Sequence, residues 1–149
     1  MAMTLRNLVF GSLAALLLAA CGSGPVKRIS PPTASIQELK VGSDGRWHLL
    51  VRVQNFSNVE MTFSAIDAGL EIAGSEAGRI AVPLKLDIPG ASADVFETSL
   101  APAPGTRPGP ADFAYRLHGS IESSEPTGKF DFERKSRLSP VPGLPDTWR

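Results

Sequence analysis

The feature that most constrains the fold is an alternation of apolar and other side chains between Arg46 and Gln54. The apolar positions of one face are Trp47, Leu49, Val51 and Val53. Successive side chains of a β-strand point to opposite faces, so a period of two indicates a strand with one buried face. Similar runs, separated by turn residues, continue from Thr33 to about Arg137, and no segment there has a convincing amphipathic helical pattern. The sequence therefore predicts an all-β fold.

Turn residues divide this region into seven expected strands. They lie near residues 35–41, 46–54, 59–73, 80–88, 92–100, 113–121 and 130–132. Seven short strands predict an antiparallel seven-stranded β-sandwich of immunoglobulin-like size, with a small barrel as the alternative. The Cys-Trp-Cys arrangement of true immunoglobulin domains is absent.

Several irregularities are also readable. The apolar positions change from odd to even numbers within residues 59–73, which predicts a β-bulge near Ser64-Ala65. Pro83 lies inside an alternating run and favours an edge position or a bulge, because proline cannot donate to a ladder. Turns are expected at residues 42–45, 74–78 and 89–90, and the proline-rich segment 101–110 is expected to be a loop. The inward side of residues 92–100 stays open between Val95 and Phe96.

The N-terminus has the pattern of a secretory signal peptide. Arg6 precedes an apolar run of about thirteen residues, which ends in small residues at position 20. A spanning helix needs roughly twenty apolar residues, so a membrane-spanning segment is disfavoured. Cys21, the single cysteine, is then a free thiol, half of an intermolecular disulfide or a lipid anchor. Leu18-Ala19-Ala20-Cys21 resembles the bacterial lipobox, which implies cleavage before Cys21 and acylation of its thiol, for example by palmitate.

The expected domains follow from these features. They are a lipoprotein signal peptide (1–20), a lipidated N-terminus with a Gly/Ser/Pro tether (21–32), the sandwich (33–138) and a Pro-rich C-terminal tail (139–149). Loss of Arg6 leaves 14 basic against 15 acidic side chains, a net charge of −1. Nucleic-acid binding has little electrostatic support at that charge. We expect a protein of the bacterial cell envelope, and Gly22 resembles the pattern of lipoproteins on the periplasmic face of the outer membrane.

Few residues suggest chemistry. By strand parity, His48 and His118 lie opposite the apolar face, and neither has a second histidine or cysteine at metal-ligand spacing. Asp67 and Glu71 also fall on a solvent-facing side, and paired carboxylates there are available for acid–base work or for solvation alone. Ser75 is not the centre of a Gly-x-Ser-x-Gly motif and is expected in a hairpin loop. We expect no catalytic residue, metal or cofactor.

Two C-terminal features are candidates for interaction. Residues 134–137 form a short basic cluster, suited to lipid or lipopolysaccharide phosphates or to a solvated strand end. Trp148 is expected as an exposed aromatic residue in the tail, available to a partner or to the domain itself.

From Trp47 to Ile88 the chain resembles the late embryogenesis abundant type 2 family, also called the water-stress and hypersensitive-response (WHy) domain. The similar features are the alternating run 47–53 leading into Asn55, the long second strand 61–74, Gly78 and the turn 88–90. Phe56 and Ser57 stand where the family often has proline and a second asparagine. The resemblance implies a fibronectin-III-like sandwich without catalytic residues and a link to desiccation and stress protection.

The sequence thus predicts a non-catalytic, membrane-anchored envelope lipoprotein with a role in desiccation or osmotic stress. Its expected partners are the bilayer, through acylated Cys21, and client or envelope proteins. The alternative is an accessory binding module that docks a specific envelope protein or a small apolar ligand, at a sheet edge, the 101–110 loop or Trp148. An enzyme is the least favoured class.

Overall fold

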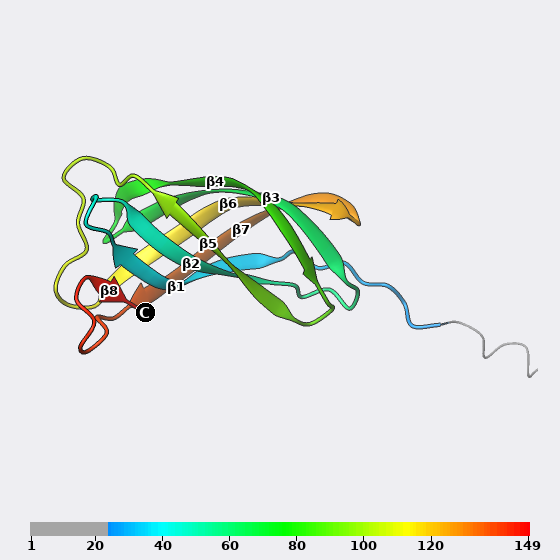
Figure 1. Ribbon diagram of the computed structural model, residues 1–149. Coiled ribbons are helices and arrows are strands. Elements are labelled where there is room, and N and C mark those ends of the chain that lie inside the picture. Colours follow the sequence, from blue (N-terminus) through cyan, green and yellow to red (C-terminus); the bar gives the residue numbers. More distant parts are fainter. Residues whose placement is uncertain (1–23) are drawn as a thin grey trace, which may run out of the picture.

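The structure is a computed structural model that describes residues 24–149 (Figure 1). The predicted signal peptide, residues 1–20, and the predicted lipidation site, Cys21, lie outside the described residues. The strands are β1 (Thr33–Val41), β2 (Trp47–Gln54), β3 (Met61–Ile72), β4 (Ser75–Ile88), β5 (Ala93–Leu100), β6 (Phe113–Glu125), β7 (Thr127–Leu138) and β8 (Thr147–Trp148). Residues 24–149 contain no helix.

The strands form two antiparallel four-stranded sheets. One has the order β5-β2-β1-β8 and the other the order β4-β3-β6-β7. Apolar side chains from both sheets form one buried cluster between them, so the arrangement is a sandwich. The all-β fold and its two antiparallel layers are confirmed, while the immunoglobulin or fibronectin-III type remains a prediction.

Strand β2 shows how the alternation becomes a core. Its four alternating apolar side chains are each at most 2% exposed, whereas His48 and Arg52 face solvent. Burying a large apolar side chain contributes about 1.5–3 kcal/mol. The alternation in this strand is therefore a main source of the stability of its sheet.

The predicted bulge in β3 is confirmed. The pairing register shifts between Phe63 and Ala65 against both β4 and β6. Phe63 before the shift and Ile66 after it are both buried, so the irregularity keeps the apolar side of the strand in the core. Pro83 lies in β4, which is an edge strand as predicted.

The turn predicted at residues 74–78 is wrong in extent. Strand β4 already begins at Ser75, and the hairpin turns through Ala73 (φ 49°) and Gly74 (φ 82°). Two consecutive positive φ angles define the two-residue hairpin turn that matches strand twist. Alanine rarely adopts a positive φ, so the sequence pattern placed the turn between Gly74 and Gly78 instead.

The count of seven strands is also wrong, because the residues predicted as a tail supply an eighth. Leu39 pairs with Trp148, and Lys40 pairs with Thr147. The segment is further held by two hydrogen bonds between Ser139 and Arg149, with N···O distances of 2.7 and 2.9 Å. A strand of two residues has no alternation to read, which is why the sequence pattern did not reveal it.

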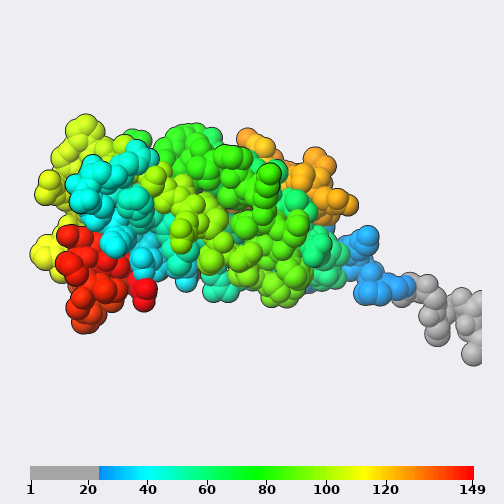
Figure 2. All heavy atoms as spheres, in the orientation of Figure 1, coloured from blue at the N-terminus to red at the C-terminus, as the bar shows by residue number. Residues whose placement is uncertain are grey.

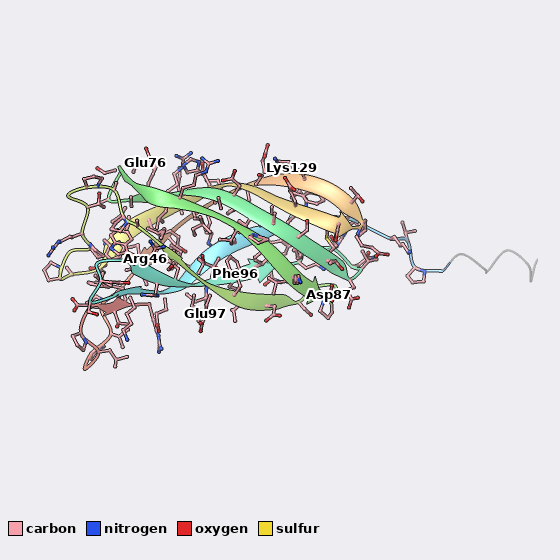
Figure 3. All side chains as sticks on the ribbon, turned by 45° about the horizontal axis from the view of Figure 1, so that its top comes forward. Arg46, Glu76, Asp87, Phe96, Glu97 and Lys129 are labelled. Carbon is pink, nitrogen blue, oxygen red and sulfur yellow. The ribbon has the colours of Figure 1, made fainter. Side chains whose placement is uncertain are left out.

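Strand β5 settles the parity that the sequence left open. Phe96 is half-buried against the core, whereas Val95 on the other side is 44% exposed. Figure 3 shows Glu97, the next residue, projecting away from the sandwich. The outer side of β5 thus carries Ala93, the exposed Val95, Glu97 and Ser99.

The sandwich has two distinct ends (Figure 1). The segment 24–32 enters at one end, beside the β2–β3 and β4–β5 connections. The β1–β2 turn, the loop 101–112 and β8 lie at the opposite end. We call these the tether end and the cavity end.

Candidate functional site

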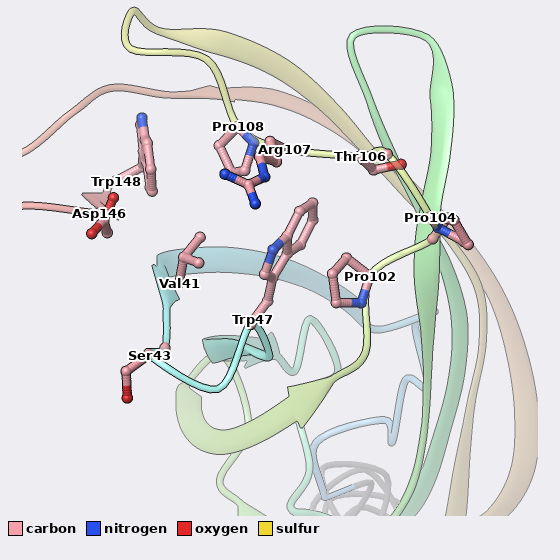
Figure 4. A pocket seen from close by; sticks show the side chains of 14 residues that line it. Val41, Ser43, Trp47, Pro102, Pro104, Thr106, Arg107, Pro108, Asp146 and Trp148 are labelled. Carbon is pink, nitrogen blue, oxygen red and sulfur yellow. The ribbon is translucent and has the colours of Figure 1, made fainter.

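A cavity of about 540 Å³ opens at the cavity end (Figure 4). This volume lies in the range of small-molecule sites. The lining comes from the β1–β2 turn, the loop 102–108 and the C-terminal segment, and includes Val41, Trp47, Arg107, Asp146 and Trp148. Segments far apart in the sequence therefore form one concave surface.

Both tryptophans of the chain line this cavity. Trp47 begins β2, where it pairs with Val41 and Leu100. Trp148 is only 7% exposed and packs edge-on against Phe113, with ring centroids 6.0 Å apart. Of the two alternatives for Trp148, the structure shows docking on the domain itself, because β8 places its indole ring in the core.

The proline-rich loop forms a further wall of the cavity. The backbone N–H of Ala103 donates to the carbonyl of Ala77 at 2.7 Å, which fastens the loop to β4. A turn follows, with a 3.0 Å hydrogen bond from Thr106 N–H to the Ala103 carbonyl and a positive φ at Gly105. Prolines at 102, 104 and 108 restrict the backbone further. The wall is therefore pre-organised, which lowers the entropy lost on binding.

Two charged residues of the lining are not engaged elsewhere. Arg107 and Asp146 are exposed, and neither forms an ion pair or a side-chain hydrogen bond with another residue of 24–149. Figure 4 shows Arg107 between the two indole rings and Asp146 on the side of Trp148. The Asp146 backbone is fixed, since its carbonyl accepts a 2.9 Å hydrogen bond from Val41 N–H. The cavity is thus lined by two largely buried indole rings, one guanidinium and one carboxylate.

A second hollow, of about 310 Å³, lies on the outer face of the β4-β3-β6-β7 sheet. Gly69 and Gly119 form its floor, and charged side chains surround them. Arg116 bridges Glu71 (2.8 Å) and Glu133 (2.7 Å), while His118 Nε2 lies 3.3 Å from the same Glu71 oxygen. The structure therefore brings together Glu71 and His118, two residues that the sequence singled out separately.

Ion pairing sets the electrostatics of this face. The hydrogen bond from Arg79 to Asp67, 2.7 Å long, lowers the pKa of the Asp67 carboxyl below its ordinary value. The hydrogen bond from Arg116 likewise lowers the pKa of Glu133. Carboxylates held in the ionised form by arginine are poor general acids. The face is thus a network of paired charges, with His118 at its margin.

The other candidate residues lie apart. His48 faces solvent on the opposite sheet, as strand parity predicted, and Ser75 is exposed in β4 rather than in a loop. Within residues 24–149, no group of three or more His, Cys, Asp or Glu side chains is placed to hold a metal ion. Residues 24–149 contain no helix with the length and apolar character needed to cross a membrane.

The basic cluster at residues 134–137 is partly neutralised. Lys135 lies 3.2 Å from Glu133, and Arg137 lies 2.8 Å from Asp112. All four residues belong to β7, so alternate side chains point to opposite faces of the sheet. They do not form a single basic surface.

Sequence reasoning identified part of the cavity and missed the rest. The proline-rich loop and Trp148 were both candidates, but as separate features. Trp47 was assigned only to the core, and Arg107 and Asp146 were not singled out. Arg107 and Asp146 are charged residues within Pro/Gly-rich segments, which was the only sign in the sequence that they lie at a site. Only the fold brings those two segments together.

The comparisons with known proteins find likenesses among solved structures alone. No protein-family model and no curated protein sequence matches the chain. A solution structure from Arabidopsis thaliana is 11% identical, with a TM-score of 0.48, and the match covers 83% of this chain and 87% of that one. A crystal structure from Archaeoglobus fulgidus is 16% identical, with a TM-score of 0.41 and coverages of 76% and 98%.

A further likeness is to the solution structure of a protein described as late embryogenesis abundant. It is 15% identical, with a TM-score of 0.40, and the match covers 94% of this chain and 86% of that one. At these identities, no functional residue carries over from any of the three to this chain.

Proposed function

We propose that the protein is a non-catalytic binding protein of the bacterial envelope, anchored through acylated Cys21, that takes a small ligand in the end cavity. The observation that carries the proposal is the cavity itself, with its two indole rings, its fixed proline-rich wall and its unengaged Arg107 and Asp146. Such a lining suits a ligand with an apolar body and a charged group.

The lining favours binding over reaction. Its hydroxyl groups are those of Ser43 and Thr106, and it contains no histidine to activate either one. An apolar ligand body gains contact with the indole rings, while an anionic group meets the guanidinium of Arg107. Each of these contacts holds a ligand without altering it.

The anchor and the cavity are compatible in position. The predicted lipidation site precedes the segment that enters at the tether end, and the cavity opens at the other end (Figure 1). A chain anchored at Cys21 to the periplasmic face of the outer membrane would leave the cavity accessible. This placement is consistent with the proposed lipid anchor. It does not require the basic cluster at residues 134–137 to contact the membrane.

The test uses 1-anilinonaphthalene-8-sulfonate, an apolar ring system with an anionic group, and the intrinsic tryptophan emission. Because both tryptophans of the chain line the cavity, energy transfer to the bound probe reports on that site. We expect saturable transfer at one probe per chain. Substituting Arg107→Gln should weaken probe binding about tenfold, since it removes a charge-assisted contact.

The matched control is Arg52→Gln. Arg52 is also an exposed arginine, but it lies on β2 away from the cavity and contacts Gln54. The control should bind the probe as the unchanged protein does. Equal weakening by both substitutions, or no saturation, would overturn the proposed site.

A second function, protection of envelope proteins during desiccation or osmotic shock, is favoured by the resemblance of residues 47–88 to the water-stress domain. Light scattering of a labile enzyme during heating, or drying and rehydration, tests it against an equal mass of inert protein. Protection by residues 22–149 that persists in the Arg107→Gln variant would support a general surface effect. Curves that coincide with the inert protein would exclude it.

A further inference from the structure

The C-terminal part of the predicted Gly/Ser/Pro tether is fastened to the sandwich by Asn58. The side-chain oxygen of Asn58 accepts from Arg28 N–H at 2.7 Å, and its amide nitrogen donates to the Val26 carbonyl at 2.8 Å. The Asn58 backbone N–H also donates to the Arg28 carbonyl at 3.2 Å. Residues 26–28 therefore lie along the β2–β3 connection.

Ser57 adds a second point of attachment. Its hydroxyl oxygen accepts from Ser30 N–H at 2.9 Å and donates to the Ser30 carbonyl at 3.3 Å. Ser57 is itself fixed, because its N–H donates to the side-chain oxygen of buried Asn55 at 2.9 Å. The part of the predicted tether from residue 26 onward is therefore held against the sandwich.

This end of the sandwich carries a concentration of exposed apolar side chains. Five large apolar residues of the described chain are exposed, and three belong to these two hydrogen-bonded segments. The three are Val26 (82%), Ile29 (41%) and Phe56 (52%). Figure 2 shows residues from 24 onward projecting at the tether end. Single exposed apolar residues are ordinary, but a group on adjoining segments marks an interaction surface.

The length of chain before this surface identifies what it meets. Only four residues separate Cys21 from Val26. At about 3.3–3.6 Å per residue, Val26 lies within roughly 17 Å of Cys21. A headgroup layer is about 5–8 Å deep on each side of the hydrocarbon core. Acyl chains on Cys21 would therefore keep the apolar surface within reach of the bilayer.

We propose that Val26, Ile29 and Phe56 form a second membrane contact, which inserts into the interfacial layer of the bilayer that holds the Cys21 lipid. This inference rests on the proposed anchor. The contact fixes the sandwich end-on, with its cavity turned away from the lipid.

Charge at this end favours apolar insertion over electrostatic attraction. Lys27 and Arg28 are exposed and form no ion pair within the described chain, but Glu60, Asp87 and Glu125 are exposed on the neighbouring connections and strand ends. The opposing charges leave little net attraction for anionic lipid. Binding should therefore depend weakly on salt, unlike that of a polybasic segment.

The experiment reconstitutes the full lipidated chain in phosphatidylethanolamine/phosphatidylglycerol vesicles and replaces Phe56→Trp. Phospholipids brominated near the upper acyl chain should quench emission from the new tryptophan. The control is Leu144→Trp, at a residue of similar exposure (48%) in the cavity-end loop. Emission from the Leu144→Trp control should be quenched no more than emission from the unchanged protein, which comes from the two native tryptophans alone.

The added variant Asn58→Ala tests the positioning of the surface. It removes the two side-chain hydrogen bonds to residues 26–28, so quenching at position 56 should fall by about half while the circular dichroism spectrum stays unchanged. Quenching that is unaffected by Asn58→Ala would show that the docked segment does not orient the surface.

Flotation with the vesicles separates this inference from the anchor. Chains that float with no quenching at position 56 would overturn the membrane contact and leave the anchor standing. If the chains do not float, the proposed anchor is wrong. The membrane contact is then tested separately, by quenching of the Phe56→Trp variant of residues 22–149 at high lipid concentration. The core lies wholly within residues 34–148, so this soluble chain retains the sandwich. Quenching there supports the contact, and its absence overturns it.

Discussion

Asn55 fixes the tether end through a single side chain. It is fully buried, and its amide nitrogen donates to the carbonyls of Val59 (2.8 Å), Ile88 (2.9 Å) and Pro89 (3.1 Å). The same side chain accepts from Ser57 N–H. One amide thus joins the β2–β3 connection to the end of β4, which explains why an asparagine occupies this position.

We predict that Asn55→Ala lowers the free energy of unfolding by about 2–4 kcal/mol, because it leaves several buried carbonyls and one N–H without a partner. Denaturation in urea measures the loss. The exposed neighbour Asn58 is the control, and Asn58→Ala should cost about 1 kcal/mol or less. Equal losses of unfolding free energy from Asn55→Ala and Asn58→Ala would mean that burial of the Asn55 hydrogen bonds adds nothing to stability.

Gly119 is required by a close approach of two strands. A Cβ atom there would overlap the carbonyl oxygen of Asp67 and lie 2.6 Å from the Ala68 Cα. These are backbone atoms and cannot rotate away. Gly119→Ala should therefore destabilise the protein by about 1–3 kcal/mol, as overpacking does. Gly109, with nothing within 4 Å of its virtual Cβ, is the control, and thermal unfolding of both variants is the measurement.

At the level of elements, β8 is a short strand with a large contribution to packing. Trp148 is 93% buried, and its backbone pairs with Leu39 at the open side of β1. We predict that Trp148→Ala lowers the free energy of unfolding by about 3–5 kcal/mol, which is typical of a buried aromatic residue. A loss below 1 kcal/mol in urea would show that β8 is not part of the cooperative core.

Strands β3, β4, β6 and β7 are joined by ion pairs of solvent-accessible side chains, which makes stability depend on pH. Arginine partners lower the pKa of Asp67, Asp112 and Glu133 in the folded protein. The unfolded chain then binds more protons than the folded one in acid. Stability from these groups is complete above the ordinary carboxyl pKa range and is lost as the pH falls through the lowered values.

The corresponding variant is Arg116→Gln, which removes the largest cause of the lowered pKa of Glu133 and leaves the smaller contribution of Lys135. Its free energy of unfolding should fall less steeply between neutral and strongly acidic pH than that of the unchanged protein. Arg52→Gln, outside the network, should preserve the original slope. Parallel curves for all three proteins would contradict the assignment.

The sequence predicted an element well only where its pattern of apolar residues was long. The four alternating apolar residues of β2 and the phase change at Ser64-Ala65 were sufficient, because burial imposes a period of two on any long strand. The turn at Ala73 was misplaced, since alanine gives no sign of a positive φ. Strand β8 and the docking of residues 26–30 were missed because both depend on contacts with distant segments.

The same limit applies to the candidate site. The loop 101–110 was identified from its own composition, but its relation to Trp47 and Asp146 exists only in the folded chain. A cavity formed by three separate segments has no local sequence signature. The tether end is similar, because Asn58 and Val26 are 32 residues apart and no periodicity connects them.

The whole molecule has one core and no disulfide within the described chain, so it should unfold in a single transition. Tryptophan emission reports on the cavity end, while far-ultraviolet circular dichroism reports on both sheets. We predict that the two thermal curves coincide for residues 22–149. An earlier change in emission would mean that the cavity end opens before the rest of the sandwich.

The position of Pro83 has a consequence for many copies in one membrane. Copies held end-on would stand with their sheet edges facing sideways, at a local density that rises further as water is withdrawn. An unprotected edge would then pair with its neighbour and grow into a ribbon across the surface. Pro83 on β4 lacks an N–H, and Asp94 and Glu97 give β5 negative charge. Two of the four edge strands of the sandwich, β4 and β5, therefore carry features that disfavour pairing with a neighbouring copy.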